Sequence, residues 1–245
     1  MIPLLAWGLA IVFLSAYPPI FVGVILYLVT PCTDWFLVFT AMADGDVPLA
    51  LALLPTNLIL QVLLIPVYLV LFAGKVVPFQ FHALIETMLI FILLPFVCAG
   101  LTRVFLRHIK GEEQAKEAIA KILSPFQMST LTATLLIMFA GHTSTIMGNI
   151  GPLSIVFVPL IIFFVISFIL AQFTSRLFHL PYKEGALLTC TTAARNSPLS
   201  LAIAVGLFPN QPLLQVAIII GVLVELPILI LIVRLLRIMR FHIVR

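Results

Sequence analysis

Long apolar stretches separated by short polar segments run the whole length of this chain. A helix needs about 20 apolar residues, at a rise of about 1.5 Å each, to cross a hydrocarbon core of roughly 30 Å. By that measure the pattern predicts eight spans, at about residues 2–15, 20–43, 48–73, 82–105, 125–146, 152–175, 184–208 and 212–236. The predicted fold class is therefore all-α, a polytopic membrane protein.

Two of the predicted spans are interrupted by polar residues next to a proline, at 31–34 and at 195–198. An offset of 164 positions relates the two breaks and their surroundings: it joins Cys32 to Asn196, Pro48 to Pro212, and Gln61 to Glu225. Broken helices at matching positions of two halves are typical of secondary transporters built from inverted repeats. We predict two broken helices that cross near the middle of the membrane. Two ordinary proline kinks are the alternative.

The repeat divides the chain into three parts. Residues 1–73 are predicted to be the remnant of a first inverted repeat, 74–124 to be span four with a cytoplasmic linker, and 125–245 to be the rest of a second repeat, broken near 192–198. The second half holds five spans, and its last three follow the order of the three spans in the first half. We therefore expect two spans to be missing at the front of the first repeat.

Composition and charge narrow the class of protein. With 63% hydrophobic residues, 9% charged residues and a mean hydropathy of +1.27, the chain has too little polar surface for a soluble domain of its size. Eleven of the 13 Lys and Arg residues lie on one side of the predicted topology, and Lys75 lies on the other. The positive-inside rule then places both termini in the cytoplasm. We expect a multi-pass protein of the plasma membrane.

Several functional classes find no support in the sequence. It contains no phosphate loop, no zinc-protease motif and no nucleophile elbow, so we expect neither an enzyme nor a cofactor. The basic residues follow the topology and form no clustered soluble face, which argues against a nucleic-acid partner. The three cysteines have no paired spacing that would indicate a disulfide framework or structural zinc. The expected partners are the lipid bilayer and a small molecule.

The two breaks gather the candidate binding residues. Proline leaves backbone groups unpaired, and a membrane protein tolerates this only where protein or a water-filled cavity satisfies them. Arg195 suits an anionic substrate, or alternatively it pairs with Asp34 and locks the crossing. The predicted substrate-binding residues are Cys32, Thr33, Arg195, Asn196 and Ser197.

A second set of residues is predicted to couple transport to an ion. Glu225 lies in the middle of span eight between apolar neighbours. The protonation state of such a carboxylate depends strongly on whether a cation lies nearby, which is the property a coupling residue needs. The alternative is a protonated side chain that simply hydrogen-bonds to a neighbouring helix. The other predicted ion-coupling residues are Gln61, Asp34 and Asn57.

The segments that carry these residues resemble a known family. They are Thr30-Pro31-Cys32-Thr33-Asp34-Trp35 with Phe39-Thr40 and Asp44-Gly45-Asp46, then Ala194-Arg195-Asn196-Ser197, and finally Gly221-Val222-Leu223-Val224-Glu225-Leu226-Pro227. Together they resemble the arsenite-efflux branch of the bile acid:sodium symporter superfamily. The resemblance covers nearly the whole chain and aligns it with the last eight of that fold's ten helices, without the first two.

This resemblance implies roles for individual residues. In that branch a Pro-Cys-Thr carries the metalloid-linked cysteine and a Glu before a Pro is required, which correspond to Cys32 and Glu225. Cys32 is then a possible metalloid ligand, which suits thiolate chemistry. Sodium symporters of the superfamily have a Glu where this chain has Thr191, so the resemblance favours a proton over sodium. Arsenite permeases have Ala-Met where this chain has Asp34-Trp35.

Three interpretations of function remain open at this point. The first is a proton-coupled secondary transporter that exports arsenite or a related small metalloid or oxyanion. The second is a sodium-coupled symporter of organic anions such as bile acids. The third is an inactive fragment, because two spans are expected to be missing.

Overall fold

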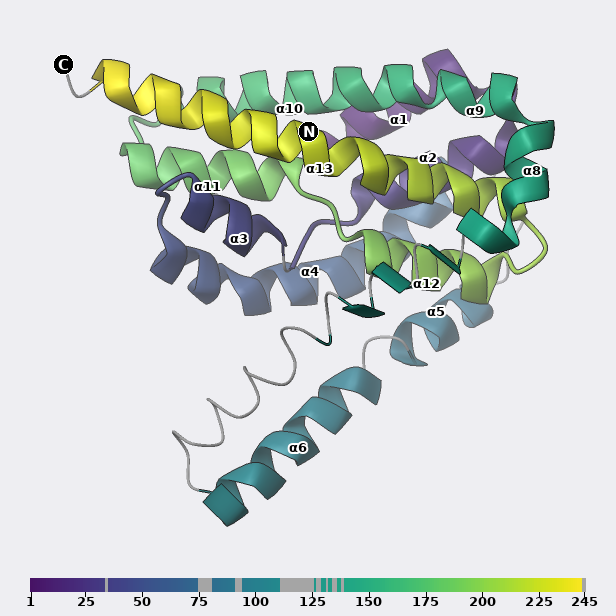
Figure 1. Cartoon of the computed structure of the whole chain (residues 1–245), viewed down its shortest axis with the longest axis horizontal. Coiled ribbons are helices and arrows are strands. Elements are labelled where there is room, and N and C mark those ends of the chain that lie inside the picture. The colour runs from purple at the N-terminus through teal and green to yellow at the C-terminus, as the bar shows by residue number, and fades with distance from the viewer. Residues whose placement is uncertain are drawn as a thin grey trace.

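The computed structural model describes residues 1–33, 35–74, 81–90, 94–110, 126, 129–130, 132–133, 136–137 and 139–243. Regular secondary structure in these residues is helical, and they contain one isolated β-bridge. The helices, shown in Figure 1, are α1 (Ile2–Leu14), α2 (Pro18–Val29), α3 (Trp35–Met42), α4 (Val47–Phe72), α5 (Phe81–Met88), α6 (Leu94–Lys110), α8 (Thr143–Gly148), α9 (Ile150–Ile155), α10 (Phe157–Leu177), α11 (Tyr182–Ala193), α12 (Ser197–Leu207) and α13 (Pro212–Ile243). The prediction of an all-α fold is confirmed.

Most of the predicted spans correspond to one helix or to a consecutive pair. Among the described residues, three segments are long and apolar enough to cross a membrane by themselves: Val47–Phe72, Ile150–Leu177 and Pro212–Arg240. The predicted span at 82–105 is divided between α5 and α6, and the predicted span at 125–146 is described only in part. Figure 1 shows α6 extending away from the other helices. The chain is therefore an all-α, multi-pass membrane protein.

Prolines mark where several helices begin. Proline occupies the first or second position of α1, α2, α4 and α12, where its missing N–H has no intrahelical partner to lose. Side chains cap two of these helices at their N-termini. Asp46 accepts a hydrogen bond from Leu49 N–H at 2.9 Å, and Asn196 accepts one from Leu199 N–H at 3.2 Å. The second break is therefore shorter than the predicted 195–198. Ser197 and Pro198 already belong to the first turn of α12.

The two breaks cross and bond to each other. α2 ends at Val29 and α3 begins at Trp35, while α11 ends at Ala193 and α12 begins at Ser197. Pro31 and Arg195 form an antiparallel bridge. On either side of it, Cys32 N–H donates to the Ala194 carbonyl at 3.3 Å and Asn196 N–H donates to the Thr30 carbonyl at 3.0 Å. The prediction that two broken helices cross is confirmed.

The helices α2 and α13 form the centre of the structure and approach closely at two glycines. Every residue of α2 from Ile20 to Val29 is buried. A Cβ atom added to Gly23 would lie 2.4 Å from the Leu214 carbonyl oxygen, and one added to Gly221 would lie 2.7 Å from the Tyr27 ring. Small residues allow membrane helices to approach each other this closely. This pair thus joins the N-terminal part of the chain to its C-terminal part.

Three segments meet at one end of the molecule. Asp44, in the turn after α3, lies 2.7 Å from Arg240 and 3.7 Å from Arg237, both near the end of α13. The turn also bonds to the start of α11, since Tyr182 donates its hydroxyl proton to the Ala43 carbonyl at 2.8 Å and Asp46 N–H donates to the Lys183 carbonyl at 3.1 Å. The charge pattern assigns all of these segments to the same side of the membrane.

The close packing at Gly221 generates a prediction. Gly221→Ala should lower the free energy of unfolding by about 1–3 kcal/mol, because the new methyl group overlaps the buried ring of Tyr27. Thermal unfolding of the purified protein in detergent measures this. Gly8→Ala in α1 is the matched control, since a Cβ atom there meets nothing within 4 Å. Equal melting temperatures for the two variants would contradict the packing argument.

Candidate functional site

Glu225 sits at the crossing and is held by three hydrogen bonds. Its carboxylate is buried, with the residue only 2% exposed. Oε1 accepts from the backbone N–H of Arg195 at 2.7 Å, and Oε2 accepts from the hydroxyls of Tyr27 at 2.7 Å and Ser197 at 3.1 Å. The donors come from α2, from the second break and from α12. One carboxylate on α13 therefore ties three other segments together.

Tyr27 is the partner that the sequence analysis missed. Its hydroxyl lies 2.7 Å from Glu225 Oε2 and also 3.0 Å from the Gly221 carbonyl oxygen. A phenol has one proton, so it donates to only one of these acceptors at a time. A single tyrosine within an apolar helix carries little signal in sequence, because such residues are common in cores. Its importance follows from the position of α2 against α13.

Arg195 is buried, and several neighbouring groups stabilise its positive charge. The guanidinium donates to the carbonyl oxygens of Leu28, at 3.0 Å, and Thr192, and it lies 4.8 Å from the centre of the Phe163 ring. Carbonyl dipoles and an aromatic face both stabilise a cation. Asp34 lies outside the described residues, so its predicted pairing with Arg195 and its predicted coupling role stay predictions.

The remaining predicted binding residues also gather at the crossing. Cys32 is 2% exposed, and its sulfur accepts from the Trp35 N–H at 3.2 Å. Asn196 bridges the two breaks, because its side-chain amide donates to Thr33 Oγ1 at 3.1 Å. The structure thus brings together Cys32, Thr33, Arg195, Asn196 and Ser197 with Glu225. Their roles in binding stay predictions.

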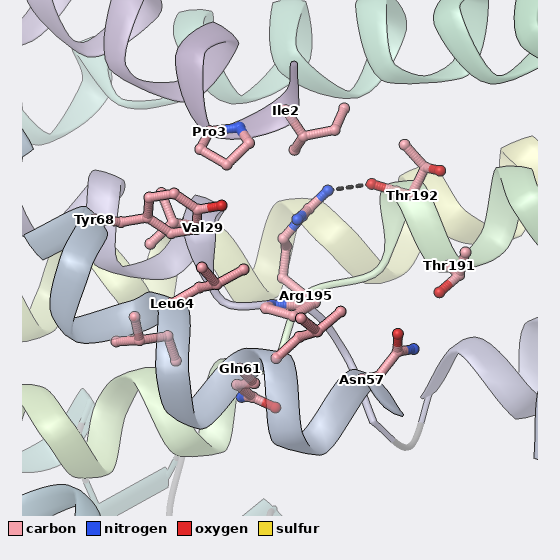
Figure 2. A pocket seen from close by; sticks show the side chains of 13 residues that line it. Ile2, Pro3, Val29, Asn57, Gln61, Leu64, Tyr68, Thr191, Thr192 and Arg195 are labelled. Atoms are coloured by element: carbon pink, nitrogen blue, oxygen red, sulfur yellow. Dashed lines mark hydrogen bonds between the residues drawn. The ribbon is translucent and has the colours of Figure 1, made fainter. Parts of the chain in front are cut away.

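A cavity of about 240 Å³ opens beside the crossing, between α4 and the end of α11. Figure 2 shows Gln61 and Asn57 of α4 on one side and Thr191, Thr192 and Arg195 on the other. Apolar residues complete its wall: Ile2, Pro3, Val29, Pro31, Leu60, Leu64, Ile65 and Tyr68. The predicted residues therefore divide into two groups, one at the crossing and one around the cavity. Cys32 and Glu225 are not among the lining residues, whereas Arg195 belongs to both groups.

Metal ions in proteins are held by groups of His, Cys, Asp or Glu side chains. The described part of the chain contains no group of three or more of these side chains close enough to hold a metal ion. Cys32 and Cys190 are the buried thiols among these residues, and each is separate from any such group. The chemistry that the site offers is hydrogen bonding, one buried carboxylate and one buried guanidinium.

Comparison with known proteins identifies relatives of this chain. The family model described as the sodium bile acid symporter family matches residues 1–149. The arsenical-resistance protein Acr3 of Corynebacterium glutamicum is 27% identical over 239 residues, which cover 93% of this chain and 64% of that protein. Acr3 of Alkaliphilus metalliredigens is also 27% identical, covering 86% of this chain and 60% of its own length. The chain thus spans about three fifths of these relatives.

The Tyr27 hydroxyl gives a prediction about stability. Tyr27→Phe should lower the free energy of unfolding by about 1–3 kcal/mol, because the one buried hydrogen bond that the hydroxyl donates, to Glu225 Oε2 or to the Gly221 carbonyl, is lost while the ring stays in place. Chemical denaturation at neutral pH measures the change. Tyr17→Phe provides the comparison, since Tyr17 is only partly buried, at the N-cap of α2. Losses of the same size in both variants would argue against the proposed role of this hydroxyl.

Proposed function

The chain belongs to the sodium bile acid symporter family, and on that premise we propose that it acts as an ion-coupled secondary transporter. It is a transport protein and not an enzyme, and its substrate passes the crossing of the two broken helices. The observation that carries this proposal is the burial of Glu225 at the crossing, with donors from both repeats. Midplane sites where broken helices meet are typical of such transporters.

The proposed substrate is arsenite or a related small metalloid or oxyanion, which the protein exports. Support comes from relatives named arsenical-resistance proteins, which align with 86–93% of this chain. Cys32 lies at the first break, where a thiol would bind a trivalent metalloid. One thiol binds such a substrate weakly, and weak binding allows its release on the far side.

The proposed coupling ion is a proton carried by Glu225. An ionised Glu225 accepts all three hydrogen bonds described above. After protonation its new O–H needs an acceptor, and the Tyr27 oxygen can serve once Tyr27 donates to the Gly221 carbonyl instead. Proton binding therefore rearranges the contacts between α13 and α2. A proton driven by 100 mV supplies about 2.3 kcal/mol, enough for a roughly fiftyfold gradient.

The proposed location is the plasma membrane, with both termini in the cytoplasm. The contacts of Asp44 with Arg237 and Arg240 support this orientation, because they place the end of α13 beside the turn after α3. The start of α11 lies there too, through Lys183. A cluster that includes two arginines and a lysine fits the cytoplasmic side by the positive-inside rule.

Glu225→Gln tests the coupling. The amide mimics the protonated carboxyl, so the variant should bind and exchange arsenite but fail to concentrate it under an imposed pH gradient. The measurement is arsenite accumulation in sodium-free, inside-out vesicles. Wild-type transport that requires sodium would favour the alternative of sodium-coupled symport of organic anions. A Glu225→Gln variant that still accumulates arsenite would exclude Glu225 as the proton carrier.

Cys32→Ser tests the metalloid ligand. It should abolish arsenite resistance in a sensitive host without lowering the amount of protein in the membrane, because serine is a poor ligand for a soft metalloid. The buried Cys190 and the exposed Cys98 give control variants. Cys98→Ser is the safer one, since Cys190 adjoins the second break. Full resistance in Cys32→Ser would contradict a metalloid–thiol contact.

A further inference from the structure

Gln61 is a buried side chain whose amide has no hydrogen-bond partner. The residue is 1% exposed, and neither its Oε1 nor its Nε2 atom has a partner within the described structure. Among the described residues, the Nε atom of Arg195 is also buried without a partner. Both residues line the same cavity (Figure 2). An unpaired buried polar group destabilises a protein, so two of them at one cavity indicate that a ligand completes their bonding.

The comparison with Glu225 strengthens this inference. Gln61 and Glu225 occupy equivalent positions of the two repeats, 164 residues apart. Glu225 accepts three hydrogen bonds from protein groups. Gln61, by contrast, lines a cavity, and its amide has no hydrogen-bond partner in the described part of the chain. At this position the first repeat thus has an amide without hydrogen-bond partners, where the second repeat has a carboxylate bonded to protein groups.

The cavity restricts what this ligand can be. The Gln61 amide needs both a donor and an acceptor, and the Nε–H of Arg195 needs an acceptor. The guanidinium repels cations, and a cavity of about 240 Å³ is below the usual range for drug-sized ligands. A small solute with hydroxyl groups supplies donor and acceptor together. The threonines Thr191 and Thr192 add further hydroxyl groups to the wall.

We propose that this cavity binds a small oxyacid through its hydroxyl groups, with the Gln61 amide and the Arg195 Nε–H as its main contacts. This proposal deepens the proposed function. It rests on that function in one respect, which is that the oxyacid bound here is the one that the protein transports. Cys32 is not among the residues that line the cavity. Recognition in this cavity therefore depends on hydrogen bonds, and the proposed bond to the Cys32 sulfur would form outside it.

Equilibrium binding to the purified full-length chain, near neutral pH and without any ion gradient, tests the proposal. Two probes are used: arsenous acid, and boric acid, which carries three hydroxyl groups but does not bind soft thiolates. Both should raise the melting temperature of the wild type. Gln61→Met should bind both about tenfold more weakly or worse. Without ligand, this variant should melt above the wild type, because it removes an unpaired buried amide.

Two comparisons make the test specific. Gln215→Met removes another buried amide, but this one donates to the Phe208 carbonyl at 3.2 Å, so the variant should melt lower and keep the full response to both acids. Gln61→Leu repeats the test with a second apolar side chain. Unchanged binding in Gln61→Met and Gln61→Leu would overturn the proposal. Stabilisation of the protein by sodium alone would also overturn it. So would the loss of arsenous acid binding in Cys32→Ser, together with a wild type that does not respond to boric acid.

These outcomes are separable from those of the transport assay. A protein that binds both acids in a Gln61-dependent manner but fails to accumulate arsenite in vesicles would contradict the proposed function and leave the binding site standing. A protein that accumulates arsenite while Gln61→Met retains wild-type affinity would contradict the binding site alone.

Discussion

The constraint on which the structure depends is that backbone groups within a membrane must find partners. Breaking a membrane helix at a proline exposes amides and carbonyls that lipid cannot satisfy. This chain breaks two helices and lays the breaks antiparallel, so that Pro31 and Arg195 pair and the adjacent amides bond across. Neither break would be tolerated without the other. The crossing is therefore both the least regular part of the protein and the part that the surrounding helices are arranged to hold.

Three kinds of interaction support that crossing. Glycines at 23 and 221 bring α2 and α13 into contact. Glu225 then ties α13 to α2, to the second break and to α12. The guanidinium of Arg195 satisfies the carbonyls of Leu28 and Thr192, which lie at or next to the ends of α2 and α11. Polar side chains here replace the backbone bonds that the prolines remove, which explains their concentration in so apolar a chain.

Much of this arrangement could be predicted from the sequence, because prolines mark the two breaks and a fixed offset of 164 positions relates them. Pairs of residues 164 positions apart indicated both breaks and the two polar mid-span residues, and they predicted the crossing. Side-chain partners depend on helix rotation, which spacing does not determine. For that reason Tyr27 was missed. Gln61 and Glu225 were expected to share a coupling role, yet one faces a cavity and the other a set of donors. Pro198 was assigned to the break because proline usually ends helices, whereas here it begins one.

The contact between Gly23 and the backbone of Leu214 has a mechanical consequence. At this point the two helices touch backbone to backbone, with no side chain that could change rotamer to let one slide along the other. The register between α2 and α13 is therefore fixed by backbone contact at this point, although the two helices come from opposite halves of the chain. We therefore expect any motion that exposes the crossing to alternate sides of the membrane to carry α2 and α13 together.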